Sequence, residues 1–259
     1  MTTPESNRSS TVHRETKEPM PLWVSGVHAV KEVLRTKPDQ VDLVVLVGRH
    51  PSHRMFIAMA REHGIPYTTS EERLPEFLRR KKHAPVFARL AAFRYADPED
   101  LLEAVRPTTI FLVLDHVQDP TNLGNIMRTA AGAGVQGIFI PRHRGVRVTP
   151  TVAHIASGAL PYVPVARYGS LQQLIQQLQE RGVWVVAADP YAPEPWFALK
   201  GNRPIALVLG HEGEGVTKTV LQLCDQTVCI PMVHLESLNV AASAAILLYE
   251  VVRQRMTAS

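Results

Sequence analysis

The chain has 259 residues, of which 45% are hydrophobic and 20% are charged, and this ordinary globular balance excludes wholesale disorder. Its formal net charge is +4 and its pI is near 9.2, which is compatible with a polyanionic partner without requiring one. No apolar run approaches the roughly 20 residues of a membrane span, and the N-terminus lacks the apolar segment of a secretion signal. We therefore expect a cytoplasmic protein with no membrane partner.

Residues 1–19 are polar and lack periodic apolar positions, which predicts a disordered tail. From Leu22 onward, short β-rich runs alternate with segments of helical period, the pattern of an α/β fold. We divide the chain into this tail, a first domain at 20–96, a linker at 97–108 and a second domain at 109–259. The elements expected up to the linker are strands at 22–26, 41–48 and 84–93, and helices at 27–37, 52–64, 71–83 and 97–105.

The second domain alternates more regularly than the first. Its strands are nearly continuous apolar runs, which is typical of a parallel sheet covered by helices on both faces. The expected strands are 109–117, 137–140, 163–166, 184–189, 204–210 and 227–232, and the expected helices are 123–133, 151–159, 170–182, 217–224 and 237–256. In such sheets ligands bind beyond the carboxyl ends of the strands, so the polar residues at which each strand stops are the informative ones.

The first informative stop is LDHVQDPTNLGNIMRTA at 114–130. Asn122 and Arg128 are six positions apart on the helix that follows, which leaves them about 120° from each other around its axis. They can therefore flank one cleft without sharing a face. A helix-capping Asn122 and a solvated Arg128 would explain each residue taken alone.

The second stop is LVLGHEGEGV at 207–216, a hydrophobic strand that ends in three glycines around two glutamates. Glycine lets the backbone come close to a ligand. The glutamates argue against a phosphate cradle and favour a cationic or hydroxyl-bearing ligand.

The third stop opens the segment 230–255, where Ser237 can cap a long apolar helix and Asn239 lies in its first turn. The small residues AASAA at 241–245 indicate a close-packed surface, either within the molecule or between two copies. Packing alone could explain this segment.

Together these segments resemble the SpoU/TrmH family of RNA ribose 2′-O-methyltransferases, a branch of the SPOUT superfamily. The family's DPxNLGxxxRTA pattern is Asp119 to Ala130, its GxEGEG is Gly210 to Gly215, and its IPM followed by SLNV lies within 230–240. The resemblance covers about 109–256. It implies transfer of a methyl group from S-adenosyl-L-methionine to a ribose 2′-hydroxyl of structured RNA, a guanosine of ribosomal RNA rather than transfer RNA. It also implies a deep C-terminal trefoil knot, a homodimer and no metal.

Residues 22–95 are similar to the small RNA-binding domain, like ribosomal protein L30e, that many family members carry in front of the catalytic domain. The similarity includes a GxHAV-like stretch from Gly26 to Val30. The resemblance therefore implies an L30e-like domain that binds the RNA substrate.

The resemblance also assigns roles to individual residues. Those that contact the cofactor are Leu209, Gly210, Gly213, Ile230, Met232 and Leu238, and those around the reacting groups are Asn122, Arg128, Glu212, Ser237 and Asn239. This chain departs from the family at 233–236, where VHLE replaces a loop that usually has five residues. We expect a tighter loop there.

Two basic clusters are candidates for RNA contact, Arg79 with Arg80 at the end of one helix and Arg142, Arg144 and Arg147 after the strand at 137–140. A charge run is otherwise usually a solvated face. We rank the second cluster higher because it lies beside the predicted active-site edge.

The family's usual mechanism makes the arginine the base. An arginine pKa is about 12.5 or above, so deprotonating it near pH 7 costs at least about 7 kcal/mol. We therefore favour Arg128 as a ligand of an RNA phosphate and of the developing alkoxide, with proton removal by phosphate or solvent.

Three other functions compete with this interpretation. The AGAGV at 131–135 superficially matches a dinucleotide-binding fingerprint, but its glycines end a helix instead of opening one. A non-catalytic RNA-binding protein with the same fold would not need all five candidate site residues. Methylation that protects the ribosome from an antibiotic stays open as the third alternative.

The two cysteines of the chain, Cys224 and Cys229, fit no redox or zinc motif, and we interpret them as buried, reduced thiols.

Overall fold

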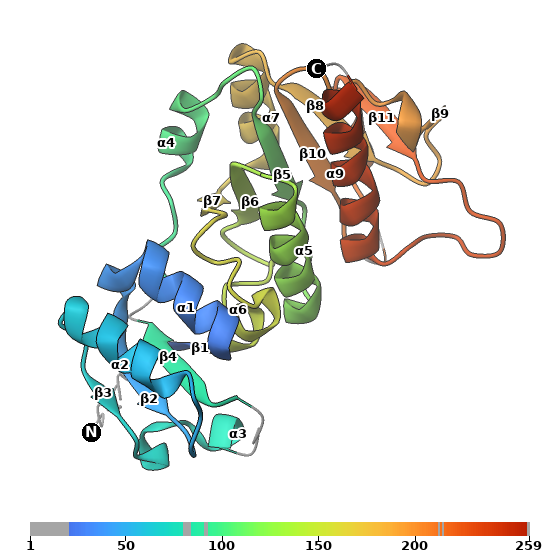
Figure 1. The fold of residues 1–259 in the computed structure, drawn as a ribbon. Helices are drawn as coiled ribbons and strands as arrows, with labels where there is room; N and C mark the ends of the chain where they lie inside the picture. The colour runs from blue at the N-terminus through green and yellow to red at the C-terminus, as the bar shows by residue number, and fades with distance from the viewer. Residues whose placement is uncertain (1–20, 80–83, 91–92, 212, 214, 258–259) are drawn as a thin grey trace, which may run out of the picture.

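The computed structural model describes residues 21–79, 84–90, 93–211, 213 and 215–257, and Figure 1 traces its two sheets. The predicted tail at 1–19 lies outside these residues. The first unit is a small sheet with strand order β1-β4-β2-β3, in which only β2 and β3 are parallel. Its elements are β1 (Leu22–Ser25), α1 (Val27–Thr36), η1 (Pro38–Gln40), β2 (Val41–Leu46), α2 (His53–Glu62), β3 (Tyr67–Thr68), η2 (Glu71–Arg73), α3 (Glu76–Arg79) and β4 (Val86–Leu90).

The second unit is built on a seven-stranded sheet with the order β7-β6-β5-β10-β8-β11-β9, and every neighbouring pair in it is parallel. This confirms the predicted α/β class. Its elements are α4 (Pro98–Glu103), β5 (Ile110–Leu114), α5 (Pro120–Gly132), β6 (Gly137–Pro141), α6 (Pro150–Ala156), β7 (Val165–Tyr168), α7 (Leu171–Glu180), β8 (Trp184–Ala188), β9 (Glu194–Pro195), η3 (Trp196–Ala198), β10 (Ile205–Leu209), α8 (Lys218–Leu223), β11 (Gln226–Cys229) and α9 (Val240–Thr257).

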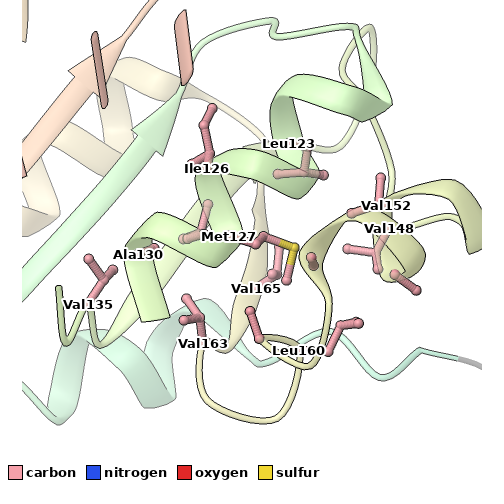
Figure 2. Close-up of a cluster of buried hydrophobic side chains, with 14 of the residues drawn as sticks. Leu123, Ile126, Met127, Ala130, Val135, Val148, Val152, Leu160, Val163 and Val165 are labelled. Carbon is pink, nitrogen blue, oxygen red and sulfur yellow. The ribbon is translucent and has the colours of Figure 1, made fainter. Parts of the chain in front are cut away.

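Strand periodicity divides the apolar residues of the larger sheet between two cores. In β5, Leu112 and Leu114 face the core under α5, α6 and α9, whereas Phe111 and Val113 face the core under α4 and α7. All five residues of β5 and of β10 are buried, as the continuous apolar runs predict. Figure 2 shows the first core around α5, where Met127 lies among valines of α6, β7 and their flanking loops.

Three local predictions were wrong. The helix expected at 71–83 is interrupted at Pro75, which cannot continue the turn of η2, and only α3 follows within the described residues. The helix expected at 52–64 begins one residue later, at His53, and Ser52 does not cap it with its side chain, since the Ser52 hydroxyl lies 2.7 Å from Nδ1 of His50. The last helix begins at Val240, so Ser237 does not cap it.

Other helix starts follow the expected chemistry. Asp97 accepts a bond from the backbone N–H of Glu99 and begins α4, as predicted. Asp119, and not Asn122, accepts from Thr121 at the start of α5. The AGAGV segment ends α5 at Gly132 and turns into β6, which confirms that its glycines do not open a helix.

The two units share one continuous apolar core. Residues of β1 and α1 belong to the same buried cluster as residues of α5 and α6. The ring Nδ1 of His154 on α6 lies 2.9 Å from the Ser25 hydroxyl of β1. After α6 the chain turns at Gly158, where an added Cβ would lie 3.2 Å from Cα of Ala29 on α1. Figure 1 shows this contact as the place where α1 and β1 meet α6.

Two predictions from composition can be compared with the fold. Within the described residues, each helix is too short or too polar to cross a membrane. Cys224 and Cys229 are free thiols, but both are half-buried and not fully buried as predicted, since Cys224 directly follows α8 and Cys229 is the last residue of β11. Burial raises the pKa of the Cys224 thiol to about 12, so this thiol stays protonated and unreactive at neutral pH.

Candidate functional site

A pocket of about 690 Å³ opens at the carboxyl edge of the larger sheet, where β8, β10 and β11 end. Its volume is within the roughly 300–1,000 Å³ of small-molecule sites. The pocket is lined by all six residues to which the sequence assigns cofactor contact, Leu209, Gly210, Gly213, Ile230, Met232 and Leu238. Because parallel strands end at the same edge, the second and third strand stops are brought together here.

The loop after β10 folds back tightly on its own start. An added Cβ at Gly210 would lie 2.1 Å from the carbonyl carbon of Gly215, so only glycine fits. The Gly215 N–H donates to the His211 carbonyl at 2.9 Å, and the Gly213 N–H donates to Nδ1 of His211 at 3.0 Å. The predicted site residue Glu212 lies outside the described residues.

The segment after β11 forms the other wall of the pocket. Ser237 and Leu238 line it, and Asn239 stands directly before α9. Asn239 Oδ1 accepts a bond of 2.9 Å from the Ala241 N–H, so Asn239 caps the helix, whereas the sequence predicted Ser237 for this role. Two apolar side chains of the shortened loop are exposed, Val233 at 86% and Leu235 at 66%, while Glu236 of the same loop lines the pocket.

Helix α5 contributes one buried and one exposed candidate residue. Asn122 is 5% exposed, and its Oδ1 accepts a bond of 2.9 Å from Nδ2 of Asn239. Arg128 lies six residues further along the helix, is exposed, and does not line the pocket. The structure therefore joins Asn122 to the cofactor-side segment and leaves Arg128 on an open face of α5.

Charged, uncharged polar and apolar side chains share the wall of the pocket. Asp189 follows β8 and Glu236 precedes Ser237, and Lys218 begins α8. The apolar lining comes from the ends of strands and from Leu238. Such a pocket suits a flat apolar ring together with a zwitterionic group. The described residues contain no group of three or more His, Cys, Asp or Glu side chains that could hold a metal ion.

Sequence reasoning missed two parts of this edge. The strand at 184–189 was predicted, but the residues at its carboxyl end were not predicted to belong to the site. Asp189, Pro190 and Tyr191 line the pocket. The Asp115–His116 pair after β5 was also passed over, although it lies at the first strand stop. In both places the signal was present, a polar residue directly after an apolar strand.

The basic candidates are not brought together. Arg142, Arg144 and Arg147 are exposed in the loop after β6, at the same edge of the sheet as the pocket. Arg79 is exposed at the end of α3 in the first unit, and Arg80 lies outside the described residues.

The sequence was compared with known proteins. The profile of the SpoU rRNA methylase family matches residues 109–249. YacO of Bacillus subtilis, named for the TrmH family of tRNA/rRNA methyltransferases, is 39% identical over 238 residues, which cover 90% of this chain and 96% of that protein. The chain belongs to the SpoU rRNA methylase family.

Solved structures of SpoU and related proteins share the whole fold. The SpoU methyltransferase AviRb of Streptomyces viridochromogenes, in complex with AdoMet, has a TM-score of 0.77 at 24% identity over 92% of this chain and 91% of that chain. An RNA 2′-O ribose methyltransferase has a TM-score of 0.73 at 22% identity, with 91% and 89% covered. These likenesses confirm the family fold. The knotted course of the last segment stays a prediction.

Proposed function

We propose that this chain transfers a methyl group from S-adenosyl-L-methionine to a ribose 2′-hydroxyl of structured RNA. The observation that carries the proposal is the single pocket wall formed by the glycine loop after β10 and the segment before α9. These are the segments to which the family resemblance assigns the cofactor. A guanosine of ribosomal RNA is the proposed target, in preference to transfer RNA.

The residues of the pocket fit the proposed cofactor. Leu209, Ile230 and Leu238 offer apolar surface for an adenine ring. Asp189 and Glu236 offer carboxylates to a cationic sulfonium and ammonium, and Lys218 offers an ammonium to a carboxylate. The close approach of Gly210 to Gly215 keeps side chains out of this wall, so backbone groups can contact the ligand.

When bound, the cofactor supplies a methyl group on a positively charged sulfur. The ribose oxygen would form a bond to that carbon as the sulfur–carbon bond breaks, and the hydroxyl proton would leave to a phosphate or to solvent. Arg128 binds an RNA phosphate and stabilises the negative charge that develops on the oxygen. Asn122 and Asn239 hold α5 against the segment that lines the pocket, which sets the distance between the two substrates.

The proposal also includes the roles of the first domain and the linker, the homodimer, and two further site residues. The first unit, residues 20–96, binds and positions the RNA as an L30e-like domain, and 97–108 connects it to the catalytic unit. Two copies form the working homodimer, and they act in the cytoplasm, where the RNA is. Ser237 and Glu212 complete the group around the reacting atoms.

Calorimetric titration of the full chain with S-adenosyl-L-methionine tests the cofactor. We expect one site per chain. The absence of binding would refute the enzymatic function and leave the non-catalytic RNA-binding alternative. Mapping of 2′-O-methylation in ribosomal and transfer RNA from a strain that lacks this chain, with and without re-expression, then identifies the nucleotide. A methyl group that is lost only from transfer RNA would refute the ribosomal target.

A further inference from the structure

The segment between β5 and α5 carries a hydrogen-bonded aspartate–histidine pair to which the proposed reaction gives no role. Asp115 directly follows β5 and is 4% exposed. Its Oδ1 lies 2.6 Å from Nδ1 of His116, whose side chain is 46% exposed. A carboxylate oxygen can only accept, so Nδ1 carries the proton and Nε2 is the ring nitrogen left for a ligand.

His116 is held in an unusual backbone conformation, and so is one residue of the neighbouring loop. The φ angles are 59° at His116 and 58° at Arg144, in the left-handed region that residues other than glycine rarely adopt. The two residues follow β5 and β6, which are neighbours in the sheet. Strained residues of this kind cluster at sites that bind ligands.

The loop 142–147 after β6 has a fixed backbone. The Arg142 N–H donates to the Tyr168 carbonyl at 2.8 Å, and the Val146 N–H donates to the Val117 carbonyl at 2.8 Å. An added Cβ at Gly145 would lie 2.5 Å from Cγ of Pro141. The loop is therefore anchored next to His116, while its arginines stay exposed.

The same segment also adjoins the pocket. The Asp115 N–H donates to the Leu209 carbonyl at 2.7 Å, and Leu209 lines the pocket. His116 consequently lies between the end of the pocket strand and the basic loop. The guanidinium groups of the loop present only donors, and Nε2 of His116 donates when the ring is protonated, so these side chains match the oxygens of a nucleic-acid backbone.

We propose that His116 and the arginines of loop 142–147 bind the phosphate backbone of the RNA beside the target nucleotide. His116 donates from Nε2 to one phosphate as an imidazolium, while Nδ1 stays bonded to Asp115. Arg144 supplies a guanidinium to a neighbouring phosphate. The inference rests on the proposed function, since it names the surface that holds the substrate of that reaction.

His116→Gly and Arg144→Gly test the proposal without endangering the fold. Glycine accepts the left-handed backbone more readily than the native residues, so we expect both variants to fold, with Arg144→Gly close to the wild type in melting temperature and His116→Gly lower because the buried Asp115 carboxylate loses its bond from Nδ1. Arg203→Ala is the matched control, because Arg203 is an exposed arginine at the opposite, amino edge of the sheet, where it stacks on Trp184.

Filter binding of protein-free ribosomal RNA at several salt concentrations is the direct readout. We expect His116→Gly to weaken RNA binding by about five- to tenfold, as loss of a charge-assisted hydrogen bond does. For Arg144→Gly the slope of log affinity against log salt should become shallower by about 0.7–0.9, the value of one phosphate contact. The affinity for S-adenosyl-L-methionine should stay unchanged in both variants, and Arg203→Ala should bind RNA as the wild type does.

Two results would overturn the inference. The first is that both glycine variants bind RNA with the affinity and salt slope of Arg203→Ala. The second is that His116→Gly lowers kcat while RNA affinity is unchanged, which would make His116 a participant in the chemistry. Because RNA binding is measured without cofactor, a wild-type chain that binds RNA through this surface yet transfers no methyl group would refute only the proposed function.

Discussion

Asn239 donates a hydrogen bond of 2.9 Å from its Nδ2 to Oδ1 of Asn122, across 117 positions of sequence. The other end of the same amide accepts from the Ala241 N–H and caps α9. One side chain thus starts the last helix and fixes it to the first turn of α5. The segment that lines the pocket is held between β11 and this bond.

Replacement of Asn239 separates its two roles. Asn239→Ser keeps a capping oxygen but is too short to reach Asn122, so we expect near-native stability with weaker binding of S-adenosyl-L-methionine. Asn239→Ala loses both bonds and should also lose about 0.5–2 kcal/mol of stability. Thermal unfolding and calorimetric titration measure the two effects. Native cofactor affinity in Asn239→Ser would show that the bond to Asn122 does not shape the pocket.

Gly210→Ala should abolish cofactor binding. The new Cβ would fall 2.1 Å from the carbonyl carbon of Gly215, and neither backbone segment can yield without opening the loop. Gly169→Ala is the control, because no atom lies within 4 Å of its added Cβ and its φ is not positive. Titration of both variants with S-adenosyl-L-methionine makes the comparison. Equal affinities would mean that the glycine loop is not part of the cofactor wall.

Arg128 should affect catalysis without affecting the cofactor. It does not line the pocket, so we expect Arg128→Ala to bind S-adenosyl-L-methionine normally while kcat falls by about 10²–10³-fold, the range for loss of one charge-stabilising donor. Arg128→Lys should recover little activity, because an ammonium lacks the fork of a guanidinium. Near-full activity of Arg128→Lys with a pH optimum shifted downwards would instead support the role of a base.

Glu250 gives α9 a pH-dependent anchor. Its side chain is 2% exposed, and it accepts bonds from Arg253 at 2.7 and 2.8 Å. Those bonds hold the pKa of Glu250 below its ordinary value, in opposition to the effect of burial. The stabilisation is therefore complete above the unfolded pKa of about 4.3 and is lost as the pH falls through the lower folded value.

The difference in melting temperature between the wild type and Glu250→Gln measures this anchor. We expect the variant to melt lower at pH 7 and the difference to shrink as the pH falls below about 4. A constant difference from pH 7 to pH 3 would contradict a contribution from the ionised carboxylate.

Most strands and their order along the chain could be predicted because the buried strands of a parallel sheet are read directly from apolar runs, as in β5 and β10. The two-residue edge strands β3 and β9 were not predicted, because neither contains an apolar run. The start of α9 was misplaced because Ser237 and Asn239 are both good capping residues. Only the tertiary bond to Asn122 decides between them. Likewise, Pro75 indicates a helix break, but one helix was predicted across it because the charged residues on both sides have a strong helical preference.

The site residues that could be predicted are those that short sequence motifs or strand ends identify. The six pocket residues come from strand ends and short motifs, so their shared edge follows from the parallel sheet. The link between Asn122 and Asn239 depends on how α5 and α9 pack, which periodicity does not specify. The left-handed conformation of His116 is also invisible in the sequence, since its neighbours Asp115 and Val117 are held by backbone bonds to distant segments, β10 and the loop after β6.

The apolar core shared by the two units bears on how the molecule comes apart. Because β1 and α1 bury their apolar residues against α6, neither unit can open without exposing part of the other's interior to water. Heating should therefore produce a single cooperative transition, with equal calorimetric and van't Hoff enthalpies. The N-terminal unit is therefore part of the same cooperative folding unit as the larger sheet. A fragment that begins at residue 97 would expose the apolar face of α6 to water, and we expect it to aggregate.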